Sequence, residues 1–140
     1  MQNRALGPFS VANVALGCMN FCHAYGSPVS AEQSHSVLHA ALDAGVTMFD
    51  TAALYGFGAS ESLVGPVLQP HRDRITLASK GGMAGVRGDD GVMRRVIDGR
   101  PKTLRQNCED SLQRLGTDVI DLYYLHRWDK NVPIEESVGE

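Results

Sequence analysis

The sequence predicts an α/β fold in which parallel strands alternate with helices, and three observations favour it. Short apolar runs of about five residues recur along the chain, and longer amphipathic segments separate them. The amphipathic segments begin and end at residues that commonly cap helices. Alternation of this kind is typical of βαβ units, in which a helix connects two parallel strands.

The first elements can be placed from turn and capping signals. Residues 4–12 can form a small hairpin, and residues 13–17 are predicted to be the first buried strand. A helix is expected to follow Ser30, because Ser30 and Gln33 have the spacing of a capping box, and Gly45 is expected to end it. Four residues of this helix share one apolar face: Val37, Leu38, Ala41 and Leu42.

The middle of the chain repeats the pattern. Residues 46–50 and 75–79 are predicted strands, and residues 59–68 form a weaker helix between them. The helix is weakened because Pro66 inside it lacks a backbone donor. Residues 81–100 are glycine-rich and are expected to form a long loop.

The last part of the chain carries another strand between two helices. Residues 101–115 are predicted to be a helix that starts at a proline, which helices favour at their first position. Asp110 and Arg114 are expected to pair along it, which stabilises a helix by a few tenths of a kcal/mol. Residues 119–125 are the fourth predicted strand, and a further helix begins at Pro133. Five residues of the 101–115 helix are expected to be buried: Leu104, Cys108, Ser111, Leu112 and Leu115.

Length, charge and composition exclude several classes of protein. The chain has 140 residues, about one domain, and a formal net charge of −3, which argues against a general binder of nucleic acids. Hydrophobic residues make up 43%, too many for a disordered protein. Three cysteines without framework spacing argue against a disulfide-stapled secreted module. With no candidate membrane span or signal peptide in the sequence, we expect a soluble cytoplasmic protein.

Three of the four predicted strands end in an ionisable residue. Asp50, Lys80 and His126 stand at these ends, and Tyr55 lies in the segment after Asp50. Ligands of parallel α/β folds bind at the carboxyl ends of the strands, so these four side chains are expected to converge on one site.

This set of residue types suits reduction of a carbonyl group. Tyrosine is a poor acid at neutral pH, and a neighbouring ammonium group stabilises its phenolate. Lys80 could do this for Tyr55, with Asp50 holding Lys80 in place and His126 donating a hydrogen bond to the carbonyl oxygen. The hydride must come from a cofactor, because no side chain carries one.

Other candidate sites are weaker. Cys18, Cys22 and His23 fit no strong zinc pattern and lack a fourth ligand, so packing roles are favoured and no metal is expected. His35 and His39 are spaced four apart on a helix but lack the glutamate of a metalloprotease, and they are expected at the surface. The glycines after Lys80 are not a phosphate-binding loop, whose lysine would follow them.

Four segments, in order, resemble the aldo-keto reductase family. Residues 45–56 (GVTMFDTAALYG) resemble a family signature, and residues 78–82 (ASKGG) resemble its lysine strand. Residues 114–129, with LYYLHRWD at their end, resemble its histidine strand. Residues 17–19 (GCM) resemble the end of its first barrel strand. The segment around Asp98-Gly99-Arg100-Pro101 is most similar to the bacterial branch that resembles potassium-channel β-subunits and pyridoxal reductases.

The resemblance implies a TIM-type (β/α)8 barrel that reduces aldehydes and ketones with NADPH and without metal. Asp50, Tyr55, Lys80 and His126 match the family's catalytic tetrad, with Tyr55 as proton donor. Met19 and Asp50 would lie beside the nicotinamide ribose. Phe21 and Trp128 would border the substrate, a small aldehyde or ketone. Nucleic acids and membranes are not expected partners.

The chain supplies only part of such a barrel. A complete barrel has eight strands and about 250 residues, whereas this sequence holds the first four β/α units, an incomplete barrel. We expect an N-terminal half: residues 1–12 as a hairpin, and 13–140 from the first barrel strand to the start of the fourth helix. The expected cause is truncation of a longer enzyme, although the open edges of a half-barrel could also self-associate.

Two alternatives to an enzyme remain at this point. The chain could be a non-catalytic module of the same fold that binds a cofactor or a protein, as channel β-subunits do. It could also be an inactive fragment, which would expose apolar surface and aggregate.

Overall fold

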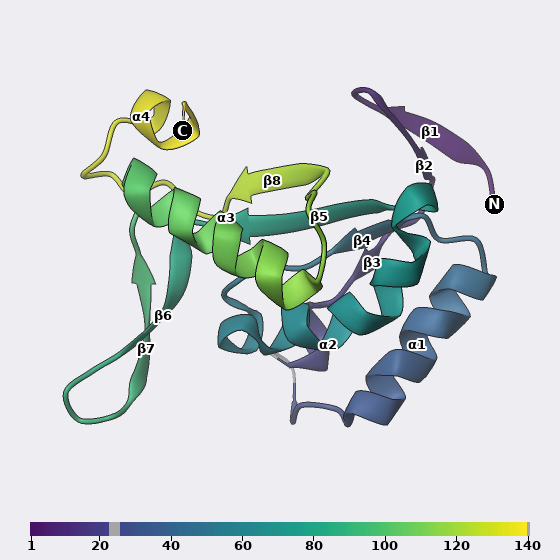
Figure 1. Ribbon diagram of the computed structural model, residues 1–140, viewed down its shortest axis with the longest axis horizontal. Coiled ribbons are helices and arrows are strands. Elements are labelled where there is room, and N and C mark those ends of the chain that lie inside the picture. Colours follow the sequence, from purple (N-terminus) through teal and green to yellow (C-terminus); the bar gives the residue numbers. More distant parts are fainter. Residues whose placement is uncertain (23–25, 140) are drawn as a thin grey trace.

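A computed structural model describes residues 1–22 and 26–139 and confirms the predicted α/β fold. One parallel sheet has the strand order β3-β4-β5-β8, the same order as in the sequence. Its strands are β3 (Leu16–Gly17), β4 (Met48–Asp50), β5 (Thr76–Gly81) and β8 (Leu122–Leu125). Figure 1 shows three helices together on one side of this sheet: α1 (Ala31–Asp43), α2 (Ala59–Leu68) and α3 (Pro101–Leu115).

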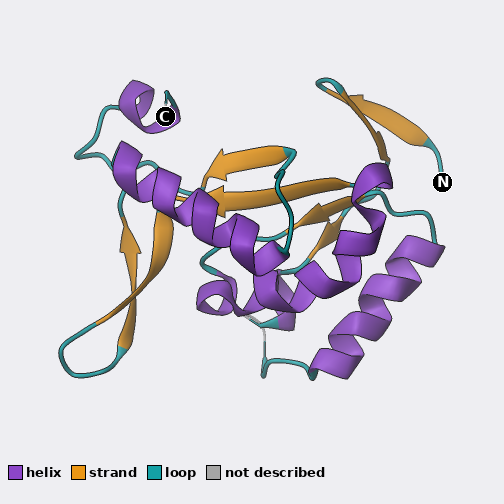
Figure 2. Cartoon of the chain, viewed as in Figure 1, coloured by secondary structure: helices purple, strands orange, loops and turns teal. Residues whose placement is uncertain are grey.

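Two antiparallel hairpins lie outside the sheet, as Figure 2 shows. The first pairs β1 (Asn3–Leu6) with β2 (Phe9–Ala12), and the second pairs β6 (Met83–Arg87) with β7 (Met93–Ile97). Short helices complete the described chain: η1 (Met19–Phe21), η2 (Tyr55–Gly58), η3 (Gln69–Arg74) and α4 (Ile134–Val138). No helix in this part of the protein is long and apolar enough to cross a membrane.

The helix signals in the sequence are confirmed. Ser30 caps α1, and its Oγ accepts a hydrogen bond from the Gln33 backbone N–H at 3.1 Å. The bounds of α2 and α3 agree with the prediction, and Pro66 does not interrupt α2.

The core lies between the sheet and the three helices, and Phe49 and Leu77 of the strands are fully buried in it. Helices α2 and α3 approach closely at Gly65, where a Cβ atom would stand 2.8 Å from the carbonyl oxygens of Arg114 and Leu115. Glycine is therefore required at this helix contact. The apolar side chains that these three helices bury in the core are Leu38, Leu42, Val64, Val67, Leu68 and Leu115.

Strands β3, β4 and β8 are shorter than predicted because other contacts use their first residues, whereas β5 continues to Gly81, two residues past its predicted end. Asn13 donates its backbone N–H to the Gln2 carbonyl, extending the first hairpin instead of the sheet. The Val46 N–H bonds back to Ala41 of α1, and the Val119 carbonyl accepts from Arg72.

Three further predictions are wrong. Residues 81–100 are not a loop but contain the β6–β7 hairpin, whose turn is closed by hydrogen bonds between Gly88, Gly91 and Val92. Val37 is 41% exposed rather than buried, whereas Ser34 is fully buried on the inner face of α1. Two residues of α3 that were predicted to be buried, Cys108 and Leu112, are only half-buried, and Cys108 lines an open groove between α3 and α4.

Candidate active site

The four residues expected to converge lie at or just beyond the carboxyl ends of neighbouring strands. Asp50 ends β4, Lys80 is the penultimate residue of β5, and His126 directly follows β8. Tyr55 begins the short helix η2 beyond β4. The His126 N–H donates to the Gly81 carbonyl at 2.9 Å, which continues the β5–β8 ladder past the end of β8.

Lys80 is the centre of this group. Its Nζ lies 2.7 Å from Asp50 Oδ2 and 2.8 Å from the Thr51 carbonyl oxygen, so two of its three donors are used in fixed positions. The same ammonium group lies 4.9 Å from the centroid of the Tyr55 ring, within the range of a cation–π contact. The Lys80 side chain is 15% exposed, and that of Asp50 is 32% exposed.

Tyr55 is enclosed between Lys80 and His126. The ring centroids of Tyr55 and His126 lie 5.7 Å apart with an interplanar angle of 89°, an edge-to-face contact. Tyr55 is buried in a small apolar cluster with Ala52, Leu54 and Met83. The structure therefore brings all four residues together, with a positive charge beside the tyrosine.

Hydroxyl groups behind Asp50 connect the strand ends to α2. Ser60 Oγ donates to the Cys18 carbonyl at 3.2 Å and lies 2.9 Å from Thr51 Oγ1. The Cys18 N–H donates to the Asp50 carbonyl at 2.8 Å. These bonds connect Asp50 and Thr51 to Cys18 and to α2.

A buried carboxylate lies behind Lys80 on the helix side of the sheet. Glu61 is fully buried and accepts from Ser79 Oγ at 2.5 Å and from Arg114 Nε at 2.7 Å. The predicted Asp110–Arg114 pair is therefore wrong, because Arg114 reaches across to α2 while Asp110 accepts from Gln106. The role of Glu61 gives no signal in the sequence, since a glutamate in an amphipathic helix usually faces water.

The cysteine nearest the site is a neutral thiol. Burial, and to a lesser extent the Asp50 carboxylate, raises the pKa of Cys18 to about 12. Burial also raises the pKa of Cys22, which is half-buried. Neither sulfur is a ready nucleophile.

The residues expected to contact cofactor or substrate lie in different surroundings. Met19 packs against the apolar cluster that contains Tyr55. Phe21 is 7% exposed and belongs to the core between sheet and helices, not to that cluster. Trp128 is 51% exposed, and its Nε1 donates to the Val132 carbonyl at 3.0 Å.

The histidines and cysteines that were weighed as metal ligands form no cluster in the part that the structure describes. No group of three His, Cys, Asp or Glu side chains comes together there. His23 lies outside the described residues. His35 is not at the free surface as expected, because its Nε2 lies 3.1 Å from the Leu63 carbonyl oxygen at the contact with α2.

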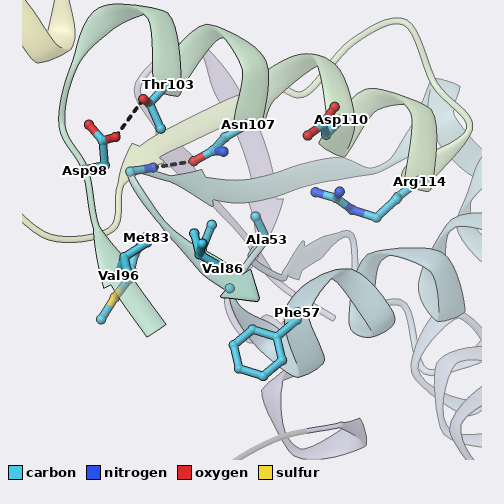
Figure 3. Close-up of a pocket in the computed structure, with 13 residues that line it drawn as sticks. Ala53, Phe57, Met83, Val86, Val96, Asp98, Thr103, Asn107, Asp110 and Arg114 are labelled. Atoms are coloured by element: carbon cyan, nitrogen blue, oxygen red, sulfur yellow. Dashed lines mark hydrogen bonds between the residues drawn. The ribbon is translucent and has the colours of Figure 1, made fainter. Parts of the chain in front are cut away.

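A cavity of about 240 Å³ lies between the β6–β7 hairpin and α3 (Figure 3). Apolar side chains line one side of it, and Asn107, Asp110 and Arg114 of α3 line the other. Asn107 Oδ1 accepts from the Gly82 N–H at 3.0 Å and so holds the start of the hairpin. None of the four converging residues lines this cavity.

Comparison with known proteins identifies the family. Residues 13–140 match the aldo/keto reductase family model. The chain belongs to the aldo/keto reductase family. A probable aldo-keto reductase from Glycine max is 44% identical over 133 residues, which are 94% of this chain and 37% of that protein. This chain thus spans well under half the length of that curated relative.

Solved structures show the same fold. Aldo-keto reductase AKR11C1 from Bacillus halodurans, in its holo form, matches with a TM-score of 0.84 and 32% identity over 99% of this chain and 44% of its own. The glycerol dehydrogenase AKR11B4 from Gluconobacter oxydans matches with a TM-score of 0.78 and 37% identity over 92% and 39%. These enzymes are (β/α)8 barrels, so the parallel sheet of this chain is part of such a barrel.

Proposed function

We propose that this chain carries the catalytic residues of a reductase that converts aldehydes or ketones to alcohols with NADPH. In this proposal it acts as the N-terminal half of a longer enzyme, and a second half-barrel completes the site. The observation that carries the proposal is the contact of Lys80 with Asp50 and with the Tyr55 ring at the strand ends.

The residues present fit the reactive end of the cofactor. Lys80 holds Asp50 Oδ2, and the Asp50 side chain stays 32% exposed, so it can accept a hydrogen bond from a ribose hydroxyl. Met19 supplies an apolar surface beside Tyr55 for the nicotinamide. When bound, the cofactor supplies the hydride.

The chain's own residues then handle the oxygen of the substrate. As the carbonyl carbon accepts the hydride pair, negative charge grows on the oxygen, and His126 orients that oxygen by a hydrogen bond. Tyr55 gives its proton to the oxygen, forming the alcohol, and the Lys80 ammonium stabilises the phenolate that is left. Water returns a proton to Tyr55. The reverse sequence oxidises an alcohol, the direction named for the similar glycerol dehydrogenase.

The first test measures cofactor binding to the chain itself. Trp128 is the single tryptophan and lies two residues after His126, so NADPH at the strand ends should quench its fluorescence in a saturable way. A folded chain without quenching would show that the second half-barrel is needed. The edges of β3 and β8 are where such a half, or a second copy of the chain, would add strands.

The decisive test measures turnover. A barrel-complete protein joins this chain to the part of the Bacillus halodurans enzyme that the chain does not cover, and NADPH oxidation is followed with test aldehydes. Tyr55→Phe should lower kcat by at least about 100-fold, because general acid catalysis contributes roughly 10²–10⁴-fold. Tyr123→Phe is the matched control, since the Tyr123 hydroxyl lies against Gly81 on the helix side of the sheet. A Tyr55→Phe protein that keeps its rate would refute the proposed proton donor. A stable complex with cofactor but no turnover in the unchanged protein would favour a non-catalytic binding module.

A further inference from the structure

The turn that joins Tyr55 to α2 has an unusual backbone. Gly56, Phe57 and Gly58 follow one another with φ angles of 60°, 53° and 96°. Glycine adopts such angles readily, but a phenylalanine rarely does. Within the described chain, Phe57 is the only residue other than glycine with a positive φ. Backbone of this kind persists where the surrounding structure holds it in place.

Each residue of this turn meets a different segment of the protein. A Cβ atom at Gly56 would stand 2.7 Å from the Cβ of Cys22, and one at Gly58 would stand 2.8 Å from Cδ of Arg114. The turn is therefore enclosed on both sides, with no room for larger residues at either glycine.

Phe57 itself contacts the β6–β7 hairpin. Its ring carbon Cδ1 occupies the space where a Cβ atom would stand at Gly85, so the ring rests directly on the backbone of β6. Figure 3 shows the ring beside the hairpin, across the cavity from α3. The ring is 44% exposed, so burial in the core does not account for its position.

We propose that Phe57 is a positioning residue for Tyr55. Its ring, seated on Gly85, holds the strained turn against the hairpin and thereby fixes Tyr55 between Lys80 and His126. This inference rests on the proposed function only for its catalytic consequence, because the contact and its effect on Tyr55 can be measured without turnover.

The first measurement uses the full chain and its Tyr55 and His126 ring signals in a ¹H–¹³C NMR spectrum. Phe57→Asn removes the ring, and asparagine tolerates the left-handed backbone, so the turn can keep its conformation. Both ring signals should shift. Phe57→Tyr keeps the ring and should leave them in place, and Val92→Ala, at the exposed tip of the hairpin, should do the same.

A second variant tests the contact from the hairpin side. Gly85→Ala places a methyl group where the Phe57 ring lies, so it should shift the same two signals. Adding Gly85→Ala to Phe57→Asn should cause no further shift, because the ring that would collide is already gone and the other near atom, Met93 Cε at 2.8 Å, is the end of a flexible side chain that can move aside. This variant also serves if Phe57→Asn does not fold.

Turnover by the barrel-complete protein gives the catalytic readout. Phe57→Asn should lower kcat about 10- to 100-fold, the scale expected when a catalytic group moves by about 1 Å, while KM changes little. Unchanged Tyr55 and His126 signals, or shifts equal to those of Val92→Ala, would overturn the proposal, as would shifted signals with an unchanged kcat. If the proposed function itself is wrong, the result differs: Tyr55→Phe would then keep its rate, whether or not Phe57 is also changed.

Discussion

The pairing of Arg114 with the buried Glu61 gives a stability prediction that can be worked from the structure. Glu61 is fully buried, whereas the Arg114 side chain is 28% exposed. Removing one partner of a buried ion pair costs about 3–5 kcal/mol, since the other charge is left uncompensated. Arg114→Met should therefore lower the free energy of unfolding by about 3 kcal/mol, the low end, because part of the guanidinium is already in water.

Removing the carboxylate charge instead should lower the free energy of unfolding by less than Arg114→Met does. Glu61→Gln removes the charge but keeps an oxygen that can accept from Ser79 Oγ, and Arg114 can turn toward solvent. Its cost should be about 1.5 kcal/mol, the lower range for hydrogen bonds to charged groups. In the double variant no charge is buried, so its cost should fall below the sum of the two single costs by about 1–3 kcal/mol.

Urea unfolding followed by circular dichroism measures these free energies. Arg94→Met is the matched control, because Arg94 pairs with Asp90 on the exposed hairpin and should contribute little. If Arg114→Met costs no more than Arg94→Met, the Glu61 charge does not depend on Arg114. If the double variant is fully additive, the two side chains do not interact energetically, and the reasoning fails.

Two further predictions concern titratable groups. Iodoacetamide at pH 8 should modify Cys18 last of the three cysteines, because burial raises its pKa to about 12 and leaves almost no thiolate. Peptide mass mapping after labelling of the folded protein measures the order, and early labelling of Cys18 would contradict the prediction. The Arg100 guanidinium holds the pKa of Asp98 well below its ordinary 3.8, so the stability from this contact is present above about pH 4 and is lost as the pH falls further. Asp98→Asn should therefore lose less free energy of unfolding than the unchanged chain between pH 5 and pH 2, and an equal loss would rule out this role for Asp98.

Local signals in the sequence predicted the helices well. The Ser30 cap, the proline at the start of α3 and the bounds of α2 depend on bonds within one helix or its first turn, which neighbouring residues determine. Strand lengths and the β6–β7 hairpin depend on distant partners. The glycine-rich composition of residues 81–100 concealed the hairpin, although two short runs there flank a Gly-Asp-Asp-Gly turn.

The sequence predicts which ionisable residues converge at the strand ends, but it does not predict the residues that hold them in position. Because ligands of parallel α/β folds bind at strand ends, the sequence alone is enough to group Asp50, Lys80 and His126. Glu61 and Phe57 could not be found in the same way, because their roles come from contacts with Arg114 and Gly85, far away in the sequence. The Gly-Phe-Gly run is the one local sign of the strained turn.

The agreement between strand order in the sheet and strand order in the chain bears on how the protein folds during synthesis. Each parallel strand adds to the edge left by the strand made before it, as in the pairing of Leu16 with Phe49 and of Phe49 with Leu77. A ribosome adds about 5–20 residues per second, whereas helices and hairpins form in microseconds. The β3–β4–β5 layer can therefore assemble while later residues are still being translated. The β6–β7 hairpin lies between β5 and β8 in the sequence, so the pairing of Ala78 with Leu122 has the largest sequence separation in the sheet. This pairing should therefore form last.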